Sequence, residues 1–335
     1  IALGLAQLGV EVRMVDSDKR AEALAQELVG PIPNSPFTPE LVIAAVPISA
    51  LSSVISTLEE REFKGAFIDV ASVKIKAKVE VSSSKLPISH FLPTHPMAGR
   101  EVGGAESARS DLFQGRAWII DSTDVDRDLL EKAKSLIAAL GADLVDLPVA
   151  EHDQAVALIS HLPQVIASLL AKQLSGNPES WLTLAGSGLR DTTRIAGSDP
   201  KLWREIIAAN KDSIRPLLQN FGRDLSDFID VIGDETAVEK MISDGRDGRS
   251  SIPGKHGGKV REYAYLPIVI EDKPGQLAAI FNECARANVN IEDLTIEHSP
   301  GQETGLITLA ISPTDSQRLS QHLSKAGWSV HAPRA

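Results

Sequence analysis

The feature that most constrains the fold is a series of short apolar segments that alternate with helical patterns in residues 1–148. Two of these segments, residues 41–46 and 65–70, are apolar at nearly every position. A strand that is apolar on both faces is typical of a parallel sheet covered by helices on both sides. Helical patterns separate the strands, for example at residues 19–28 and 129–140. The sequence therefore predicts an α/β domain of Rossmann type, in which functional residues gather at the carboxyl ends of the strands.

The start of the chain has the pattern of the second half of a nucleotide-binding βαβ unit. A helical pattern that stops at Gly9 is followed by the alternating segment 10–16, which predicts a strand ending in Asp16. An acid in that position accepts hydrogen bonds from the ribose hydroxyls of NAD and repels the 2′-phosphate of NADP. Asp16 is also a common first residue of a turn, and Lys19 and Arg20 could pair with a 2′-phosphate, so NADP remains an alternative. Because the chain begins inside a helical pattern, we expect the glycine-rich pyrophosphate loop upstream of the first residue.

Composition limits the classes of function. The formal net charge of -11 argues against nucleic acid as the main partner, because phosphate binding needs a basic face. No unbroken apolar run reaches the roughly 18–20 residues that a membrane-spanning helix needs. The single cysteine, Cys284, excludes an intrachain disulfide and is typical of a reducing cytosol. We therefore expect a cytoplasmic protein without a membrane or nucleic-acid partner.

The periodicity changes after residue 148. Residues 149–243 contain helical patterns without strands between them, which predicts an all-α domain, with substrate held in the cleft between it and the sheet domain. Residues 244–260 are rich in glycine and basic residues and have no apolar period, so we interpret them as a linker. Residues 261–335 have the order strand, helix, strand, strand, helix, strand. The helices expected in the all-α domain span residues 154–174, 178–186, 200–220 and 225–243.

His95 is the first candidate for a catalytic residue. It lies in the segment Thr-His-Pro-Met-Ala-Gly-Arg at 94–100, which we expect to form a loop after a strand. Imidazole titrates near neutrality, so a histidine held in place can take a proton from a hydroxyl. Val46, Pro47 and Ser72 follow other strands and are expected at the same sheet edge. Taken alone, His95 is more typical of a structural histidine that caps a strand and bonds to backbone.

Five motifs in order give a more specific interpretation. They are Asp-Val-Ala-Ser-Val-Lys at 69–74, Thr-His-Pro-Met-Ala-Gly at 94–99, Ile-Ser-His-Leu-Pro at 159–163, Gly-Leu-Arg-Asp-Thr-Thr-Arg-Ile-Ala at 188–196, and Ser-Asp-Pro at 198–200 with Trp203. With them the chain resembles the prephenate dehydrogenase family with a C-terminal ACT regulatory domain, over nearly all of its length. The resemblance implies oxidative decarboxylation of prephenate to 4-hydroxyphenylpyruvate with NAD, in tyrosine biosynthesis.

The resemblance also implies roles for individual residues. His95 would accept the proton of the substrate hydroxyl, and Ser72 would bond to the same hydroxyl or to His95. Arg194 would bind a substrate carboxylate with its planar fork, and Arg190, one helical turn earlier, would present a second cation. His161 would line the substrate pocket. Without the resemblance, the arginine pair is more typical of a solvated helix face and His161 of a core histidine.

The cofactor contacts implied by the family match are Asp16, Val46, Pro47 and Ser72, and no metal ligand is assigned. We interpret His152 and Asp153 as the N-cap of the helix that follows them, Trp203 as a core residue, and Lys74 as a residue with an unassigned supporting role.

The last domain resembles the ACT fold, whose βαββαβ units pair side by side and bind amino acids. The resemblance places the effector, tyrosine or phenylalanine, at a set of turn and strand residues: Asp272, Gly275, Leu277, Asn290 and Ile291. The alternative is a purely dimerising domain in which Pro274 and Gly275 form only a tight turn. A homodimer is the expected assembly in either case.

Two other functions remain open. Arogenate differs from prephenate by an amino group on the side chain, so an arogenate dehydrogenase is the nearest alternative. A non-catalytic amino-acid sensor that retains only the ACT activity is the second, and Ser72, His95, His161 and Arg194 together argue against it.

Overall fold

The computed structural model describes residues 1–32, 38–99, 104–252, 263–298 and 303–333. It divides into two compact units, residues 1–232 and 233–335, and each is described by itself.

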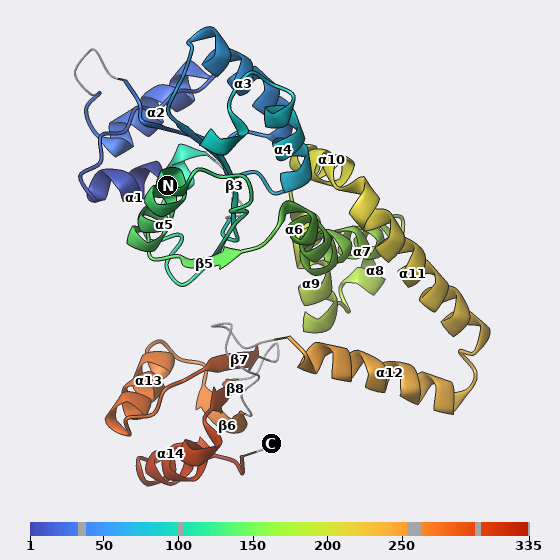
Figure 1. Ribbon diagram of the computed structural model, residues 1–335. Helices are drawn as coiled ribbons and strands as arrows, with labels where there is room; N and C mark the ends of the chain where they lie inside the picture. The colour runs from blue at the N-terminus through green and yellow to red at the C-terminus, as the bar shows by residue number, and fades with distance from the viewer. Residues whose placement is uncertain (33–37, 100–103, 253–262, 299–302, 334–335) are drawn as a thin grey trace. The chain divides into compact units, whose positions relative to one another are not determined.

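A five-stranded sheet is the centre of the first unit (Figure 1). Its order follows the chain: β1 (Leu41–Ala44), β2 (Ala66–Asp69), β3 (Phe91–Pro96), β4 (Ala117–Ile120) and β5 (Asp143–Asp146). The first three strands are parallel, β4 runs antiparallel to β3, and β5 is parallel to β4. The sheet is therefore mixed, with three parallel strands whose carboxyl ends share one edge.

Helices cover both faces of this sheet, as the apolar strands predict. Neighbouring residues of one strand serve opposite faces: Phe67 packs with α3 (Leu51–Glu60) and α4 (Lys74–Ser82), whereas Ile68 packs with α1 (Ala2–Gln7) and α5 (Arg127–Ala139). Burying a side chain of this size stabilises the fold by about 1.5–3 kcal/mol. The helix α4 was not expected from the sequence.

Residues 10–16 do not form the expected strand. The segment joins no ladder of the described sheet, where β1 pairs only with β2. An extended segment without a neighbour to pair with satisfies its backbone elsewhere, and here Gln26 does this. Its Oε1 accepts from Met14 N at 2.8 Å, and its Nε2 donates to Val12 O at 3.3 Å. Gln26 belongs to α2 (Lys19–Val29), the helix that the sequence predicts.

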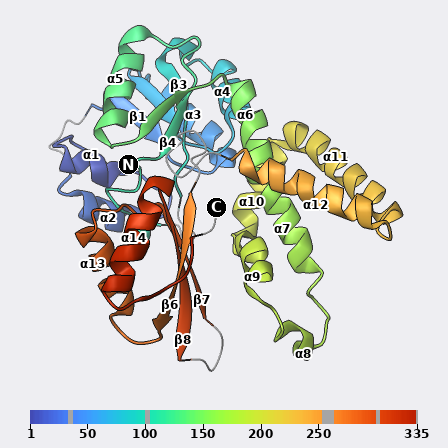
Figure 2. The same cartoon turned by 90° about the horizontal axis from the view of Figure 1, so that it is seen from below.

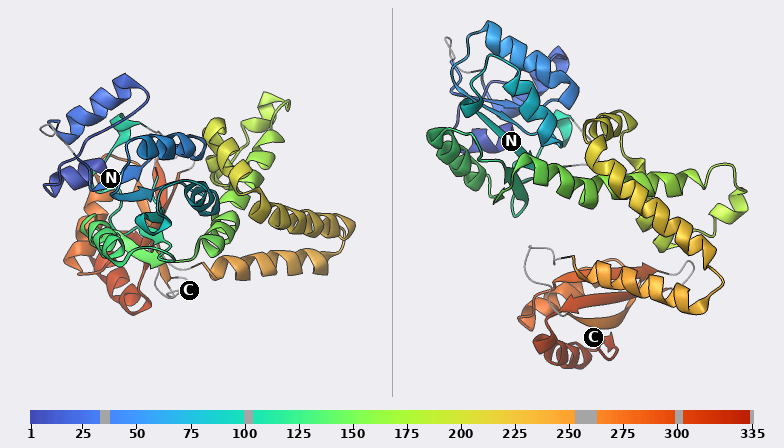
Figure 3. Two further views of the ribbon diagram at one scale, coloured as in Figure 1. Left: turned by 45° about the horizontal axis from the view of Figure 1, so that its top comes forward. Right: turned by 45° about the vertical axis from the view of Figure 1, so that its right-hand side comes forward.

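The helices of residues 149–230 complete the first unit (Figure 2). They are α6 (Val149–Val156), a π-helical turn (Ala157–His161), α7 (Leu162–Lys172), α8 (Glu179–Leu182), α9 (Ser187–Thr193), a 3-10 turn (Arg194–Gly197), α10 (Pro200–Ala209) and α11 (Lys211–Asp230). The long helix α11 contacts α6, the π-helical turn and α7 (Figure 3).

Two of the expected helix boundaries are wrong. The helix expected at 200–220 is two helices divided at Asn210, whose side chain is buried and bonds to neighbouring elements. The helix expected at 225–243 is also interrupted, because α11 ends at Asp230 and α12 (Glu235–Ser250) begins after Asp234. Asp234 caps α12 by accepting from Thr236 N at 2.9 Å, a contact that fixes where a helix starts.

The continuous helix Val149–Lys172 corrects one expectation from composition. It is long and apolar enough, by length and composition, to cross a membrane, with a mean hydropathy of 1.5 in its most apolar window. It carries His152, Asp153 and His161, which are buried and hydrogen-bonded to protein groups. Only 28% of that window is buried inside the structure, so these polar side chains lie on a buried face of a helix that also exposes large apolar residues.

The second unit contains α12 and a βαββαβ domain. Helix α12 extends to Ser250, so residues 244–250 are helical and not irregular as the linker interpretation predicts. The domain consists of β6 (Ala264–Glu271), α13 (Gln276–Arg286), β7 (Asp293–His298), β8 (Thr304–Ile311), α14 (Pro313–Lys325) and β9 (Ser329–Val330). Its sheet has the order β7-β8-β6-β9 with antiparallel pairs throughout. The predicted element order is confirmed.

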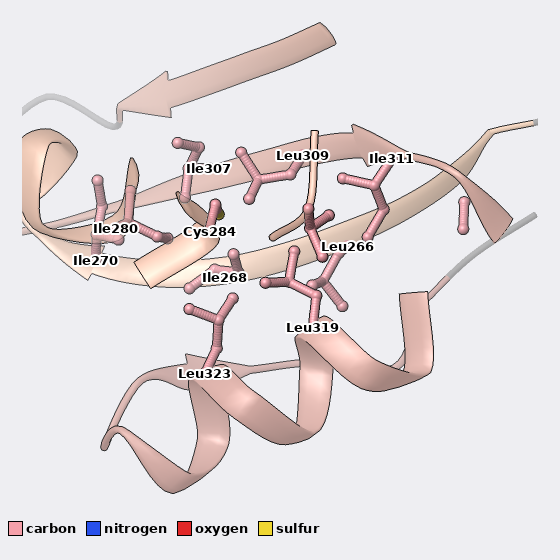
Figure 4. Close-up of a cluster of buried hydrophobic side chains, with 12 residues drawn as sticks. Leu266, Ile268, Ile270, Ile280, Cys284, Ile307, Leu309, Ile311, Leu319 and Leu323 are labelled. Carbon is pink, nitrogen blue, oxygen red and sulfur yellow. The ribbon is translucent and has the colours of Figure 1, made fainter. Parts of the chain in front are cut away.

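One apolar cluster holds this domain together (Figure 4). Leu319 and Leu323 of α14 reach the sheet face formed by Leu266, Ile268 and other buried strand residues. The single cysteine of the chain, Cys284, lies in the same cluster, and burial raises the pKa of its thiol to about 11. It is a packing residue of α13.

Candidate active site

His95 lies at the carboxyl end of β3, the central strand of the sheet. It belongs to the strand itself, opposite Ile119 of β4, and not to a loop as the sequence suggested. The apolar residues before it divide into a 3-10 turn (Ile88–His90) and the start of β3. His95 is half-buried, so a strand rather than a loop holds its imidazole at the functional edge of the sheet.

Two side chains of α6 form a chain of hydrogen bonds that begins at His95 and runs into the interior of the protein. His95 Nδ1 lies 2.8 Å from His152 Nε2, and His152 Nδ1 lies 2.7 Å from Asp153 Oδ1. The two imidazole rings meet edge to face, with centroids 5.1 Å apart. His152 and Asp153 are completely buried. They do not form an N-cap of the following helix, because α6 already begins at Val149.

Asp153 instead caps a helix of the sheet domain. Its Oδ1 accepts from Lys74 N at 2.8 Å and its Oδ2 from Ile75 N at 2.9 Å, the first two amides of α4. Amides at a helix start have no partner inside the helix and carry the positive end of its dipole, so they favour a carboxylate. The helical domain thus supplies the cap that the residue before α4, Val73, lacks.

Lys74 and Asp69 form a buried ion pair beneath His95. Lys74 Nζ donates to Asp69 Oδ2 and to Thr94 O, the latter at 2.6 Å. Thr94 Oγ1 donates to Asp69 O at 2.7 Å, which joins the ends of β2 and β3. Burial lowers the pKa of Lys74, and Asp69 opposes this shift. A buried charge of this kind is stable only while its partner is present.

The surroundings of His95 keep its imidazole neutral. Burial lowers the pKa of His95 to about 2, and the positive charge of Lys74 and the nearby His152 and His161 act in the same direction. A neutral imidazole retains a lone pair that can accept a proton. With Nδ1 engaged by His152, Nε2 is the nitrogen without a hydrogen-bond partner among the described residues.

His161 ends the π-helical turn and faces the same network. Asn210 Nδ2 lies 3.1 Å from His161 Nδ1 and donates to Asp153 O at 2.7 Å. Because a carbonyl oxygen only accepts, the amide nitrogen is identified, and His161 Nδ1 must accept from it. Burial lowers the pKa of His161 to about 4, although Asp153 opposes this. His161 is therefore neutral with its proton on Nε2, and Trp203 packs edge-on against its ring.

The other residues predicted to bind substrate lie on different elements. Ser72 is half-buried between β2 and α4, and the structure shows no hydrogen bond between it and His95; the partner of His95 Nδ1 is His152. Arg190 in α9 and Arg194 in the 3-10 turn are exposed. Gln164 Nε2 of α7 donates to Ile195 O at 2.9 Å. This bond ties the turn of Arg194 to the helix that follows His161.

The residues predicted for the cofactor lie near strand ends and at the start of α2. Val46 and Pro47 follow β1, as expected. Asp16 is exposed, and its Oδ1 accepts from Asp18 N at 2.8 Å, so it forms the turn that was one of the two interpretations. Glu22 Oε2 accepts from Asp16 N and from Lys19 Nζ, both at 2.9 Å. Two carboxylates therefore stand beside this turn.

In the βαββαβ domain, the predicted turn has the expected geometry. Gly275 has φ 90° and directly precedes α13, a conformation that favours glycine. Asp272 N donates to Glu303 O at 2.8 Å, Asn290 Nδ2 donates to Glu292 Oε1 at 2.9 Å, and Ile291 packs on the core. Leu277 is exposed.

Family models match three consecutive parts of the chain. Residues 2–146 match the nucleotide-binding domain of prephenate dehydrogenase, residues 148–242 its dimerisation domain, and residues 265–326 an ACT domain. A cyclohexadienyl dehydrogenase of Zymomonas mobilis is 31% identical over 215 residues, which are 62% of this chain and 72% of the relative. The chain belongs to the prephenate dehydrogenase family.

Two further comparisons extend the match to this family. A probable prephenate dehydrogenase, NovF of Streptomyces niveus, is 28% identical over 99% of this chain and 96% of its own length. A prephenate dehydrogenase of Aquifex aeolicus, solved in complex with hydroxyphenyl propionate and NAD+, superposes with a TM-score of 0.64 over 74% of this chain and 92% of that chain. At 24% identity the latter shows a shared fold.

Proposed function

We propose that this family member is an NAD-dependent prephenate dehydrogenase, which converts prephenate to 4-hydroxyphenylpyruvate in the biosynthesis of tyrosine. The observation that carries the proposal is His95. Its neutral imidazole lies at the carboxyl end of the central strand, with Nε2 available and Nδ1 held by a buried partner. A positioned neutral imidazole can serve as the base that the oxidation of an alcohol needs.

In this proposal the chain positions prephenate and removes one proton. His95 Nε2 accepts the proton of the ring hydroxyl, and Ser72 donates to or accepts from the same hydroxyl. Arg194 binds a substrate carboxylate with its planar fork, with Arg190 as a second cation. His161 lines the pocket, where its Nε2–H is a donor for an oxygen of the substrate. Loss of the ring carboxylate as CO2 makes the ring aromatic, so the protein mainly orients and polarises the substrate.

NAD, when bound, supplies the acceptor for the hydride of the hydroxyl-bearing carbon. The residues present fit NAD better than NADP. Asp16 offers an exposed carboxylate to ribose hydroxyls, and Val46, Pro47 and Ser72 lie after the parallel strands β1 and β2, where dinucleotides bind in such sheets. Lys19 is already paired with Glu22, so a 2′-phosphate at this turn would meet two carboxylates.

The ACT domain is proposed to bind tyrosine or phenylalanine and to regulate the enzyme. Gly275 leaves its backbone open to the amino and carboxylate groups of such a ligand. The other residues proposed for this site are Asp272 and Leu277 next to the same turn, and Asn290 and Ile291 before β7. The expected assembly is a cytoplasmic homodimer. Large apolar residues are exposed on α11, including Phe221, Leu225 and Ile229, within the part matched to the dimerisation domain.

The test is an NADH absorbance assay of the full-length protein that crosses prephenate and arogenate with NAD and NADP. We expect turnover with prephenate and NAD, and His95→Asn is the matched control that keeps a polar side chain but loses the basic nitrogen. Faster turnover of arogenate would favour the alternative dehydrogenase. Absence of turnover in all four combinations, with an amino acid still bound, would favour the non-catalytic sensor.

A further inference from the structure

A chain of buried polar groups ends at His95, and the proposed reaction assigns no role to its inner members. It runs from His95 Nδ1 to His152 Nε2 at 2.8 Å, and from His152 Nδ1 to Asp153 Oδ1 at 2.7 Å. His152 and Asp153 have no exposed surface. Burial of an imidazole and a carboxylate costs free energy unless every polar atom is paired. Here the hydrogen bonds of the two buried side chains form a chain that ends at His95.

The bonds around Asp153 determine where the protons of this chain lie. Its two oxygens accept from the amides of Lys74 and Ile75, and these contacts need a carboxylate that only accepts. His152 Nδ1 must then be a donor. A neutral imidazole has one N–H, so His152 Nε2 accepts and His95 Nδ1 donates. The ring nitrogen that remains unprotonated is Nε2 of His95.

We propose that His152 and Asp153 are positioning residues that hold His95 in this tautomer and relay its proton during turnover. The proposal deepens the proposed function and rests on it. Without the relay, His95 would become an imidazolium beside Lys74, whose positive charge opposes it. With the relay, the positive charge moves one ring further and lies against the carboxylate of Asp153, its complement in charge.

The proton and electron movements of this step balance. The proton of the substrate hydroxyl bonds to His95 Nε2, while the proton of His95 Nδ1 passes to His152 Nε2. His152 keeps its Nδ1–H on Asp153, so no proton enters the carboxylate. The electron pair of the O–H bond forms the C=O bond as the hydride carries the electrons of the C–H bond to the oxidised nicotinamide. As CO2 departs, the electrons of its C–C bond enter the ring and the carbonyl becomes a phenolate oxygen. This oxygen takes the proton back from His95 Nε2, while His152 Nε2 returns its proton to His95 Nδ1.

Two variants of the relay separate it from a structural role. His152→Phe removes the relay but leaves Asp153 on the first amides of α4. Asp153→Asn weakens both the relay and the cap. The control for lost capping is Asp126→Asn, because Asp126 caps α5 of the same domain by accepting from Asp128 N at 2.8 Å and has no contact with the relay.

In the full-length enzyme we expect His152→Phe to lower kcat by about 100-fold or more, as loss of an oriented base does, with the Kd for NADH changed by less than about threefold. Asp153→Asn is expected to lower both kcat and the melting temperature, and Asp126→Asn only the melting temperature. If His152→Phe fails to fold, His152→Gln replaces it. A kcat close to that of the wild type in the folded His152 variant, or equal loss of kcat in the two Asp variants, would overturn the proposal.

A second measurement does not depend on the substrate. The 15N shifts of the histidine side chains report which nitrogen carries the proton, and His95 is assigned by its absence from His95→Asn. We expect Nδ1–H in the wild type and a loss of this preference in His152→Phe. A wild-type His95 with its proton on Nε2 would refute the relay even if prephenate is turned over. The expected tautomer in a protein that turns over no prephenate would refute the proposed function and leave the geometry of the relay intact.

Discussion

Replacement of Lys74 by methionine tests the buried ion pair under His95. Methionine has a similar length but no charge, so Asp69 would remain as a buried carboxylate without its cation. Both side chains are almost completely buried, with exposed fractions of 2% and 1%. Breaking one partner of such a pair costs about 3–5 kcal/mol, a large part of the roughly 5–15 kcal/mol that stabilises a typical domain.

The assay is equilibrium unfolding of the protein in urea, with the loss of helix monitored by circular dichroism. With a slope of about 1–3 kcal/mol per molar urea, a loss of this size lowers the midpoint of the transition of the first unit by at least about 1 M. Lys76→Met is the matched control, since Lys76 lies on the same helix α4 and is exposed. If the two variants unfold at the same urea concentration, the buried pair does not stabilise the fold and the argument fails.

Three further predictions concern the site and the ACT domain. His95→Asn should lower kcat by about 100-fold to 10,000-fold because the basic nitrogen is lost, and unchanged turnover in a steady-state assay would remove His95 from the chemistry. Arg194→Gln should mainly raise the KM for the substrate, whereas an effect confined to kcat would contradict a binding role. In the ACT domain, the hydrogen bond from His322, with Arg286, lowers the pKa of Glu283. Its contribution to stability is present above the ordinary pKa of 4.5 and is lost as the pH falls through the lowered value. Glu283→Gln should therefore weaken the acid-side fall in melting temperature, and an unchanged pH profile would refute this.

The fold was largely predictable because its periodicities are local. Strands such as β2 are apolar on both faces, and the two faces pack on different helices, as Phe67 and Ile68 illustrate. Residues 10–16 have a strand pattern too, but a strand needs a neighbour, and pairing is not a local property. The break at Asn210 depends on bonds to Asp153 and His161, which are distant in sequence.

Candidate site residues could be predicted from the sequence where they belong to a short motif. They could not be predicted where their role depends on burial by residues distant in sequence. A short motif predicted His95 as a site residue, and another motif predicted His161. His152 and Asp153 looked like a polar pair at a helix start, because nothing in their neighbourhood indicates that β3 and α4 cover them. The sequence did contain one indication of this role, which is a histidine next to an acid in a helix with an apolar face. Such residues are buried only when their polar atoms are paired.

The π-helical turn at Ala157–His161 determines which side chains of this helix point in similar directions around its axis. In a regular α-helix each residue turns by about 100°, so His152 and His161, nine positions apart, would point about 180° away from each other. The turn accommodates one extra residue, as the bond from Leu162 N to Ala157 O shows, and the angle falls to roughly 80°. Deleting a single residue between Val156 and His161 would remove the need for the wide turn and leave the two histidines eight positions apart in a regular α-helix, which is again roughly 80°. The wide turn, and not the number of residues by itself, therefore keeps His152 and His161 within roughly 80° of each other around the helix axis.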